Sequence, residues 1–169
     1  MREFAPGFPD DARLWIHPLD PKLEAAREQE LRAALEVFFQ GWQSHGQPLA
    51  GQAEIVEGRL LLIVAGKTGA DEVSGCAGDS LLHGIGELEK RFGLRILRAP
   101  PVACRDGAGG IQIMERPEFI RALKGGLFKP ESRVFDTTLT RLGDLRAGRF
   151  EVPLNNGWHG ELYRRHAPG

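Results

Sequence analysis

The chain has 169 residues, of which 41% are hydrophobic, and its 22 lysines and arginines nearly balance its 23 aspartates and glutamates, giving a formal net charge of −1. This length and composition predict one globular domain that can bury a sizeable core without disulfides. The near-neutral charge removes any global electrostatic argument for nucleic acid or an anionic membrane and leaves room only for a local basic patch.

The sequence shows no sign of export. Residues 1–9 lack a basic start followed by an apolar stretch, so no signal peptide is expected. The longest apolar run, Leu60–Ala65, is strand-sized and falls well short of the ~20 residues of a transmembrane helix. Two cysteines, Cys76 and Cys104, are too few for a disulfide framework. We therefore expect a reduced, cytoplasmic protein.

The first predicted elements are a strand and a long helix. Residues 1–12 contain proline, glycine and aspartate and predict an irregular segment, whereas Arg13–His17 predicts a short strand. Asp20 followed by Pro21 is a helix-start signal, because aspartate caps a helix and proline suits its first position. Apolar residues at helical spacing then predict one helix over about Pro21–Gln43.

A hairpin and a second helix follow. The runs Gln52–Val56 and Arg59–Ala65 flank Glu57-Gly58, which is short enough for a hairpin turn. After a glycine-rich loop, apolar residues at helical spacing predict a helix over about Asp79–Phe92, with Gly93 at its C-terminal end.

The second half predicts another hairpin and several short elements. The hairpin strands are Leu94–Cys104, interrupted by Pro100-Pro101, and Ile111–Glu115, with Asp106-Gly107 as the turn signal. The remaining predictions are a helix between Pro117 and Gly125-Gly126, a strand at Val134–Phe135, a short helix over Thr140–Ala147 and an edge strand over Arg149–Leu154.

The order of these elements predicts the fold. Through residue 115 it is strand, helix, strand, strand, helix, strand, strand, which is typical of the split βαβ pattern. We therefore predict an α+β fold with a ferredoxin-like (split βαβ) core, an antiparallel or mixed sheet with helices on one face, and a C-terminal elaboration. The predicted single domain covers residues 13–166, after an irregular N-terminal segment at 1–12.

Gly66-Lys67-Thr68 matches only the end of a nucleotide-binding P-loop. The first glycine of that motif should stand at position 61, which is Leu61 in the interior of a predicted strand. This mismatch excludes a P-loop or ABC-type ATPase. A weaker nucleotide or phosphate interpretation is left, because glycine-rich backbone before a helix can bind an anion, although Asp71, Glu72 and Asp79 oppose it.

The polar face of the second predicted helix is the main candidate for chemistry. If the helix begins near Cys76, that residue, Asp79 and His83 fall opposite its apolar stripe. A helix N-terminus favours a thiolate, so Cys76 is a candidate nucleophile, His83 its base or counter-ion and Asp79 the residue that orients His83.

The spacing of these three candidate catalytic residues sets a condition. Cys76 and His83 are two helical turns apart, roughly 10 Å along the axis, so a direct contact needs Ser74–Gly78 to fold Cys76 back. His45 or His159 could supply the base instead. In the alternative without chemistry, Cys76 packs as a small hydrophobe, Asp79 caps the helix and His83 is solvated.

The candidate ligand-binding residues come from the same loop and from the C-terminal region. Near the helix start they are Ser74, Gly75 and Ser80; the others are His45, Trp158 and His159. Trp42 and these last three could line one pocket if the tail packs beside the end of the first helix, or both tryptophans could be core anchors.

Two further signals concern glycines and metals. Gly84 and Gly86 flank His83 and would let another segment approach closely. The chain has no CxxC or HxxxH pair, and a site made of Cys76, Cys104, His45 and His159 would exist only through tertiary structure, so no metal or cofactor is expected.

Several stretches together resemble a known family. They are RLWIHPLD, FFQGWQSHGQPLAGQAEI, VSGCAGDSLLHGIGELEKRFGL and FEVPLNNGWHGELY, in this order. The set resembles an uncharacterised family of small bacterial proteins, seen in Bacteroidetes-like genomes and often labelled "ABC transporter ATPase". The resemblance covers roughly residues 12–163 and implies a motif with the equivalents of Cys76, Asp79 and His83, although Ala77 stands where a serine is common. The label implies ATP hydrolysis, for which this sequence lacks the P-loop residues.

The sequence thus predicts a cytoplasmic small-ligand-binding domain with a pocket at Ser74–His83 and with thiol chemistry as an option, and it leaves enzymatic activity undecided. The first alternative is a protein–protein interaction or scaffold module without catalysis, and a weaker one is a nucleotide or phosphate binder without a P-loop. The expected partner is a small molecule or a protein, with a homodimer among the options, whereas nucleic acid and membranes are not expected.

Overall fold

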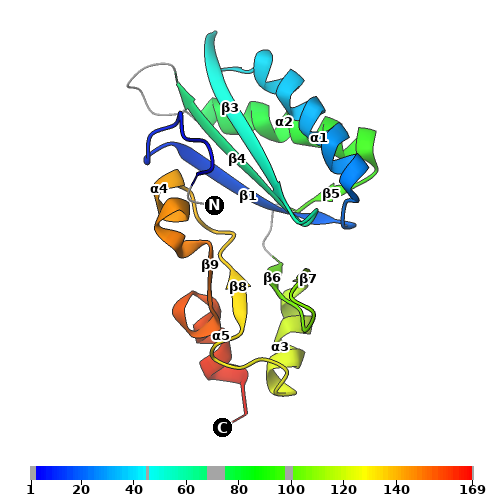
Figure 1. Cartoon of the computed structure of the whole chain (residues 1–169), viewed down its shortest axis with the longest axis vertical. Coiled ribbons are helices and arrows are strands. Elements are labelled where there is room, and N and C mark those ends of the chain that lie inside the picture. Colours follow the sequence, from blue (N-terminus) through cyan, green and yellow to red (C-terminus); the bar gives the residue numbers. More distant parts are fainter. Residues whose placement is uncertain (1–2, 45, 68–74, 98–100, 169) are drawn as a thin grey trace.

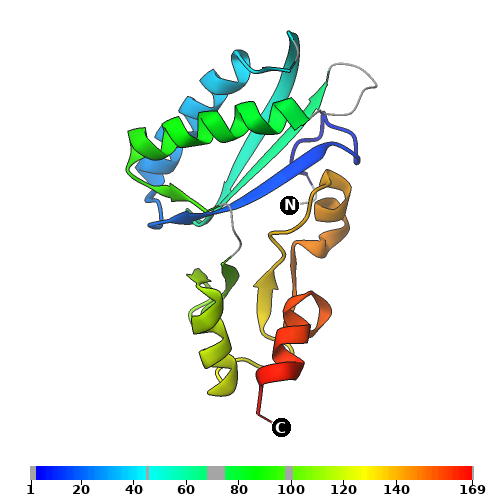
Figure 2. The same ribbon diagram turned by 180° about the vertical axis from the view of Figure 1, so that it is seen from behind.

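The computed structural model describes residues 3–44, 46–67, 75–97 and 101–168. In this part of the chain a five-stranded sheet has the order β2-β3-β4-β1-β5 and a four-stranded sheet the order β7-β6-β8-β9. Helices α1 and α2 cover one side of the first sheet, and the second sheet with α3, α4 and α5 lies on its other side (Figure 1). The view from behind shows the same division (Figure 2). The chain is therefore α+β, with antiparallel pairing in both sheets.

The first sheet is formed by the first part of the chain and the second sheet by the part that follows it. The first sheet and its helices comprise β1 (Arg13–Asp20), α1 (Ala25–Gln40), β2 (Gln43–Ser44), β3 (Gln47–Val56), β4 (Leu60–Lys67), α2 (Gly75–Phe92) and β5 (Arg95–Ile96). The second group comprises β6 (Val102–Arg105), β7 (Ile111–Met114), α3 (Arg116–Lys124), β8 (Arg133–Phe135), α4 (Leu142–Asp144), η1 (Leu145–Arg149), β9 (Glu151–Pro153), η2 (Leu154–Asn156) and α5 (His159–His166).

Strand β4 is the centre of the first sheet. Its residues Leu60–Ala65 are all buried, because neighbouring strands flank β4 and other elements cover both of its faces. The predicted hairpin with β3 is confirmed, and its turn places Glu57 at a φ of 51° and Gly58 at 67°. Leu61, which stands where a P-loop needs its first glycine, is therefore in the interior of a strand, as predicted.

The prediction of the first helix was wrong at both ends. Helix α1 begins at Ala25 and not at Pro21, because Asp20 is the last residue of β1 and pairs with Arg95 of β5. The side chain of Asp20 also forms an ion pair with Arg95 and so does not cap a helix. At the other end α1 stops at Gln40, three residues earlier than predicted, with Gly41 as its C-cap.

The second helix is longer than predicted. Helix α2 begins at Gly75, four residues before the expected start at Asp79, so Asp79 is not its N-cap. The predicted apolar side comprised five residues; four of them, Leu81, Ile85, Leu88 and Phe92, are buried, whereas the fifth, Leu82, is exposed. Gly93, with a φ of 55°, follows its last residue as expected.

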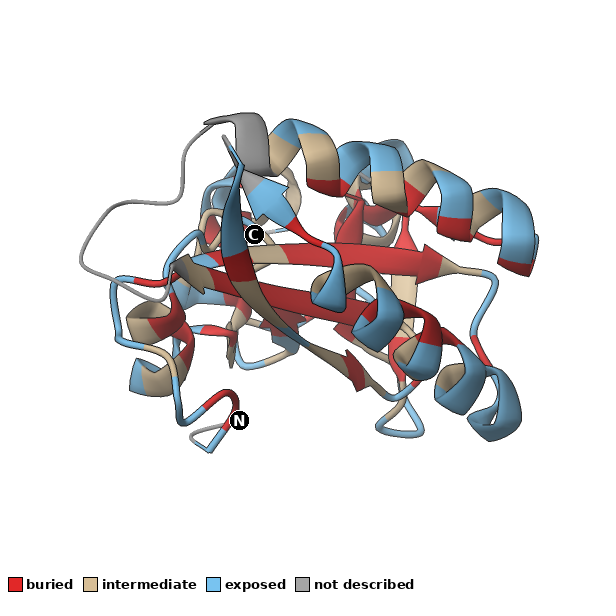
Figure 3. Ribbon diagram, turned by 90° about the horizontal axis from the view of Figure 1, so that it is seen from above, coloured by how far each residue is buried: buried red, intermediate tan, exposed pale blue. Residues whose placement is uncertain are grey.

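Helices α1 and α2 approach closely at Gly84, where the ring of Phe38 occupies the space that a side chain would need. A Cβ built on Gly84 would lie 2.4 Å from Cε2 of Phe38, whereas one on Gly86 would meet nothing within 4 Å. The predicted close approach therefore occurs at Gly84 and not at Gly86. Seen from above, the outer faces of α1 and α2 are exposed while their inner faces rest on buried strands (Figure 3).

The prediction of the second hairpin was correct for its second strand and wrong for its first. Its first strand, expected over Leu94–Cys104, is two strands: β5 pairs with β1 in the first sheet, and β6 pairs with β7 in the second. Strand β9 lies at an edge of the second sheet, as predicted. The helix expected over Thr140–Ala147 is the short α4 continued by η1, and α5 was not predicted.

A shared hydrophobic cluster joins the two sheets. From the first sheet it takes Leu14, Ile16, Leu60, Leu62 and Val64. From the second group it takes residues that include Ala103, Ile111, Phe135 and Phe150. Among the described helices, none is both long and apolar enough to cross a membrane.

Candidate functional site

The structure places the predicted site at the first turns of α2. Gly75 is the first residue of this helix, and the backbone of Cys76 belongs to its first turn, whereas Ser74 lies outside the described residues. The side chain of Cys76 is also outside the description. Asp79 and His83 are exposed on α2.

The helical backbone decides the spacing between the cysteine and the histidine. Because α2 is helical from Gly75 onward, residues 75–78 do not form the loop that would fold Cys76 back toward His83. The two residues are seven positions apart, which is about 10 Å along the helix axis. A direct hydrogen bond between Cys76 and His83 is therefore not available within this helix.

Ser80 is engaged by the core. The Trp42 indole Nε1 donates a hydrogen bond to Ser80 Oγ over 2.7 Å and so joins the end of α1 to the start of α2. Trp42 is buried and lies against Trp15, Phe38 and Phe39, with ring centroids between 5.5 and 6.3 Å apart. Trp42 is thus a core anchor, as one of the two sequence interpretations expected.

Trp158 and His159 lie in a different cluster. His159, at the start of α5, stacks on Trp158 with ring centroids 3.8 Å apart and meets the edge of Phe119 at 6.4 Å. Trp158 packs in the cluster between α3, α5 and the second sheet, whereas Trp42 belongs to the cluster under α1 and α2. The structure therefore does not bring these two tryptophans into one pocket, and His45 lies outside the described residues.

The environment of His159 is apolar. The residue has no exposed surface, and within the described chain neither of its ring nitrogens, nor Nε1 of Trp158, has a hydrogen-bond partner. Burial lowers the pKa of His159 from 6.5 to about 4, although the negative charge of Asp136 opposes this change. At neutral pH the ring is therefore uncharged and acts as part of the core.

Cys104 is not a reactive thiol. It is fully buried in β6, with Sγ 3.9 Å from Sδ of Met114, and burial raises its pKa to about 12. Among the described residues, no three histidine, cysteine or acidic side chains come close enough together to hold a metal ion.

The structure also has a feature that the sequence analysis missed, a groove on the outer surface of the helix layer. It lies between α1 and the C-terminal end of α2 and has a volume of about 370 Å³. Its lining residues are Arg27, Glu30, Ala33, Ala34, Val37, Arg91 and Phe92. The sequence signal was Val37, a large apolar residue of α1 outside its buried positions, which is 68% exposed.

The groove has a defined end. The Arg27 guanidinium donates a hydrogen bond from Nη2 to the carbonyl of Phe92, the last residue of α2. Carbonyls at a helix C-terminus lack partners within the helix, so Arg27 satisfies one of them and holds the two helices together. Phe92 itself is 5% exposed and forms part of the apolar wall.

We compared the chain with protein-family models, with curated proteins and with solved structures, and none of them matches it.

Proposed function

We propose that the protein is a small-ligand-binding domain and that its ligand lies on the layer formed by α1 and α2. The groove between the two helices, about 370 Å³ in volume, is the observation that supports this function. Small-molecule sites are concave and measure roughly 300–1,000 Å³, so the groove suits a ligand of modest size.

The helix layer rests on a core that we infer to be ferredoxin-like. The supporting observations are the order β1, α1, β3, β4, α2, β5 along the chain and the order β3-β4-β1-β5 across the sheet. Every neighbouring pair among these strands is antiparallel, which suits a split βαβ unit repeated once.

The start of α2 is a second location for ligand binding, as the sequence predicts. Thiol chemistry there has a direct test, because Cys104 is buried with a pKa of about 12 and alkylation of the folded protein would report on Cys76. An activated thiol reacts fully at a pH below the ~8.5 of a free cysteine. A rate that rises only near pH 8.5 would remove Cys76 as a nucleophile.

Exposed apolar side chains favour a second function, docking of a protein partner. Val37 of α1 is 68% exposed and Leu82 of α2 is 45% exposed. Apolar groups on a protein surface can mark an interface when they are grouped. Light scattering over a range of concentrations tests the homodimer, and a mass that stays monomeric at millimolar protein would oppose it.

A ligand screen with a groove-filling variant tests the main proposal. Ala33 lines the groove and Ala26, on the same helix, is exposed but does not line it, so Ala33→Trp and Ala26→Trp form a matched pair. We expect small fragments to shift amide signals of α1 and α2 in the wild type and in Ala26→Trp, and not in Ala33→Trp. Absence of any binder, or binding that Ala33→Trp leaves unchanged, would oppose a ligand site in the groove. Millimolar ATP belongs in the same screen as the test of the nucleotide alternative.

A further inference from the structure

We propose that the groove between α1 and α2 binds a small organic carboxylate, with the carboxylate held between Arg27 and Arg91 and the apolar body on the alanines of α1. This inference rests on the proposed function and names the class of its ligand.

The charges of the groove favour an anion. Arg27 and Arg91 both line it, and Glu30 is the one acidic residue among its lining residues. In the described part of the chain no ion pair is formed by Arg27, Arg91 or Glu30, in contrast to Arg32, Arg105, Arg133 and Arg146, which all have carboxylate partners. The groove therefore keeps one net positive charge and two guanidinium groups without a counter-ion.

The two guanidinium groups are placed by the same aromatic ring. Cζ of Arg27 lies 6.0 Å and Cζ of Arg91 lies 5.3 Å from the centroid of Phe92. Contact with an aromatic face holds a guanidinium group without neutralising its charge. Because both guanidinium groups lie within 6.0 Å of the centroid of the Phe92 ring, they line the same end of the groove.

The donors of Arg27 are only partly used. One of its N–H groups bonds to the carbonyl of Phe92, which fixes the orientation of the planar guanidinium. A guanidinium has five N–H donors in a rigid fork that matches a carboxylate, so donors are left for a ligand. Arg91 makes no side-chain hydrogen bond in the described part of the structure and is free to complete the site.

Beyond Glu30, the α1 side of the groove carries a short apolar segment, which would distinguish an organic acid from an inorganic anion. Ala33, Ala34 and Val37 line its α1 side, and Val37 exposes 68% of its surface. A ligand body that covers these residues removes their apolar surface from water, which favours binding. Inorganic phosphate would use the two arginines and gain nothing from the alanines.

A matched set of probes tests the class of ligand. Hexanoate, hexanamide and hexylamine share one body and differ in charge, and inorganic phosphate supplies the anion without the body. In NMR titrations followed on the amides of α1 and α2, we expect hexanoate to bind the wild type at least roughly tenfold more tightly than hexanamide. We expect no binding of hexylamine and weaker binding of phosphate than of hexanoate.

Variants of the two arginines test whether they bind the carboxylate. Arg91→Gln should weaken hexanoate roughly tenfold and leave hexanamide unchanged, and Arg27→Gln should do the same in protein whose thermal melt shows it folded. Arg116→Gln is the control, because it removes an exposed arginine of α3 that does not line the groove. A loss of equal size in Arg116→Gln would indicate a net-charge effect and would overturn the site.

The outcomes separate the two proposals. If hexanoate and hexanamide bind equally, or if both arginine variants keep full affinity for hexanoate, the carboxylate class is wrong while ligand binding in the groove stands. If phosphate binds as tightly as hexanoate, the apolar residues Ala33, Ala34 and Val37 contribute nothing to binding, and the carboxylate class is again wrong. If neither these probes nor any fragment that Ala33→Trp excludes binds to the groove, the proposed function itself is wrong.

Discussion

His159 shows how one buried residue sets a pH dependence. Its folded-state pKa is about 4 and its ordinary value is 6.5, so between these values the unfolded chain binds more protons than the folded one. The contribution of neutral His159 to stability is therefore complete above about pH 6.5 and is lost as the pH falls toward 4. Since one pKa unit corresponds to about 1.4 kcal/mol, the loss is on the order of 3 kcal/mol.

His159→Phe is the variant that tests this prediction. It keeps a ring on Trp158 and removes both nitrogens that lack partners, so we expect equal or greater stability at pH 7 and a flatter decline between pH 6.5 and 4. Urea unfolding at several pH values gives the slope. Leu154→Ala, in the same cluster, is the control, because it should cost about 2–5 kcal/mol at every pH. An unchanged slope in His159→Phe would contradict the assigned pKa.

At the scale of elements, the contact between α1 and α2 depends on one glycine. In Gly84→Ala the new Cβ would stand 2.4 Å from the Phe38 ring, and that ring is held by Phe39 and Trp42 at centroid distances of 5.7 and 5.5 Å. We expect a net loss of about 1–2 kcal/mol in chemical unfolding, because overpacking exceeds the gain of ~1 kcal/mol in helix propensity.

Gly86→Ala is the matched control for this prediction. It lies on the same helix, where a Cβ meets nothing within 4 Å, so only the gain in helix propensity applies and we expect about 0.5–1 kcal/mol more stability. If both variants shift stability in the same direction, the ring contact at Gly84 does not limit the approach of the helices.

At the scale of the whole molecule, Arg105 links the two sheets. Its Nη1 donates to Glu57 of the β3–β4 turn over 2.6 Å, and its Nη2 donates to Glu151 of β9 over 2.9 Å. The guanidinium also lies 4.9 Å from the ring of Phe135, and its hydrogen bond to Glu151 lowers the pKa of that carboxyl. The side chain of Arg105 is 23% exposed and that of Glu151 31%, so the pair that they form is screened less than a fully exposed pair.

Arg105→Met is expected to lower the free energy of unfolding by about 1–2 kcal/mol, because Glu57 loses this partner and Glu151 keeps only Arg133 among the described residues. Arg149→Met is the comparison, since Arg149 is 67% exposed and Asp144 is its one ion-pair partner among the described residues, and its loss should cost under about 1 kcal/mol. Equal effects in urea unfolding would mean that the link between the sheets contributes no more than a surface ion pair.

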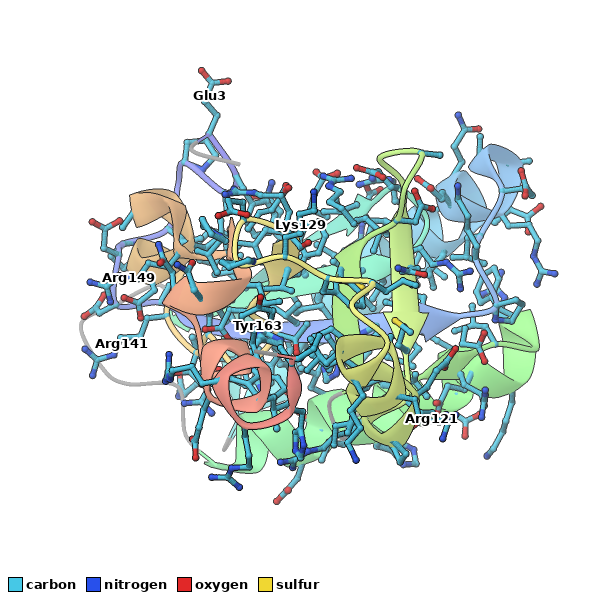
Figure 4. All side chains as sticks on the ribbon, turned by 90° about the horizontal axis from the view of Figure 1, so that it is seen from below. Glu3, Arg121, Lys129, Arg141, Arg149 and Tyr163 are labelled. Carbon is cyan, nitrogen blue, oxygen red and sulfur yellow. The ribbon has the colours of Figure 1, made fainter. Side chains whose placement is uncertain are left out.

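The underside of the molecule shows why the end of the chain escaped prediction. There α3, with Arg121, and α5, with Tyr163, are distinct helices of the second group (Figure 4). Helix α5 has only eight residues, which are too few for its apolar residues to show a helical period. Its buried residues, among them His159 and Leu162, pack in the cluster that contains Phe119 of α3, so tertiary contacts decide it.

Local signals in the sequence determined most of the first sheet and its helices. The apolar stripe of α2, the β3–β4 hairpin and Gly93 all follow from spacing or turn chemistry, which act over a few residues. The start of α1 did not follow, because Asp20 has the side chain of a cap and yet its backbone pairs with β5, a competition that no local pattern shows.

The candidate site was decided by tertiary structure. The polar face of α2, with Asp79 and His83, was visible in the sequence, but the burial of His159 and the separation of Trp42 from Trp158 were not. The groove joins Arg27 to Phe92, which are 65 positions apart along the chain. Periodicity identifies which face of each helix is buried, but only the antiparallel packing of α1 on α2 brings two arginines over one ring.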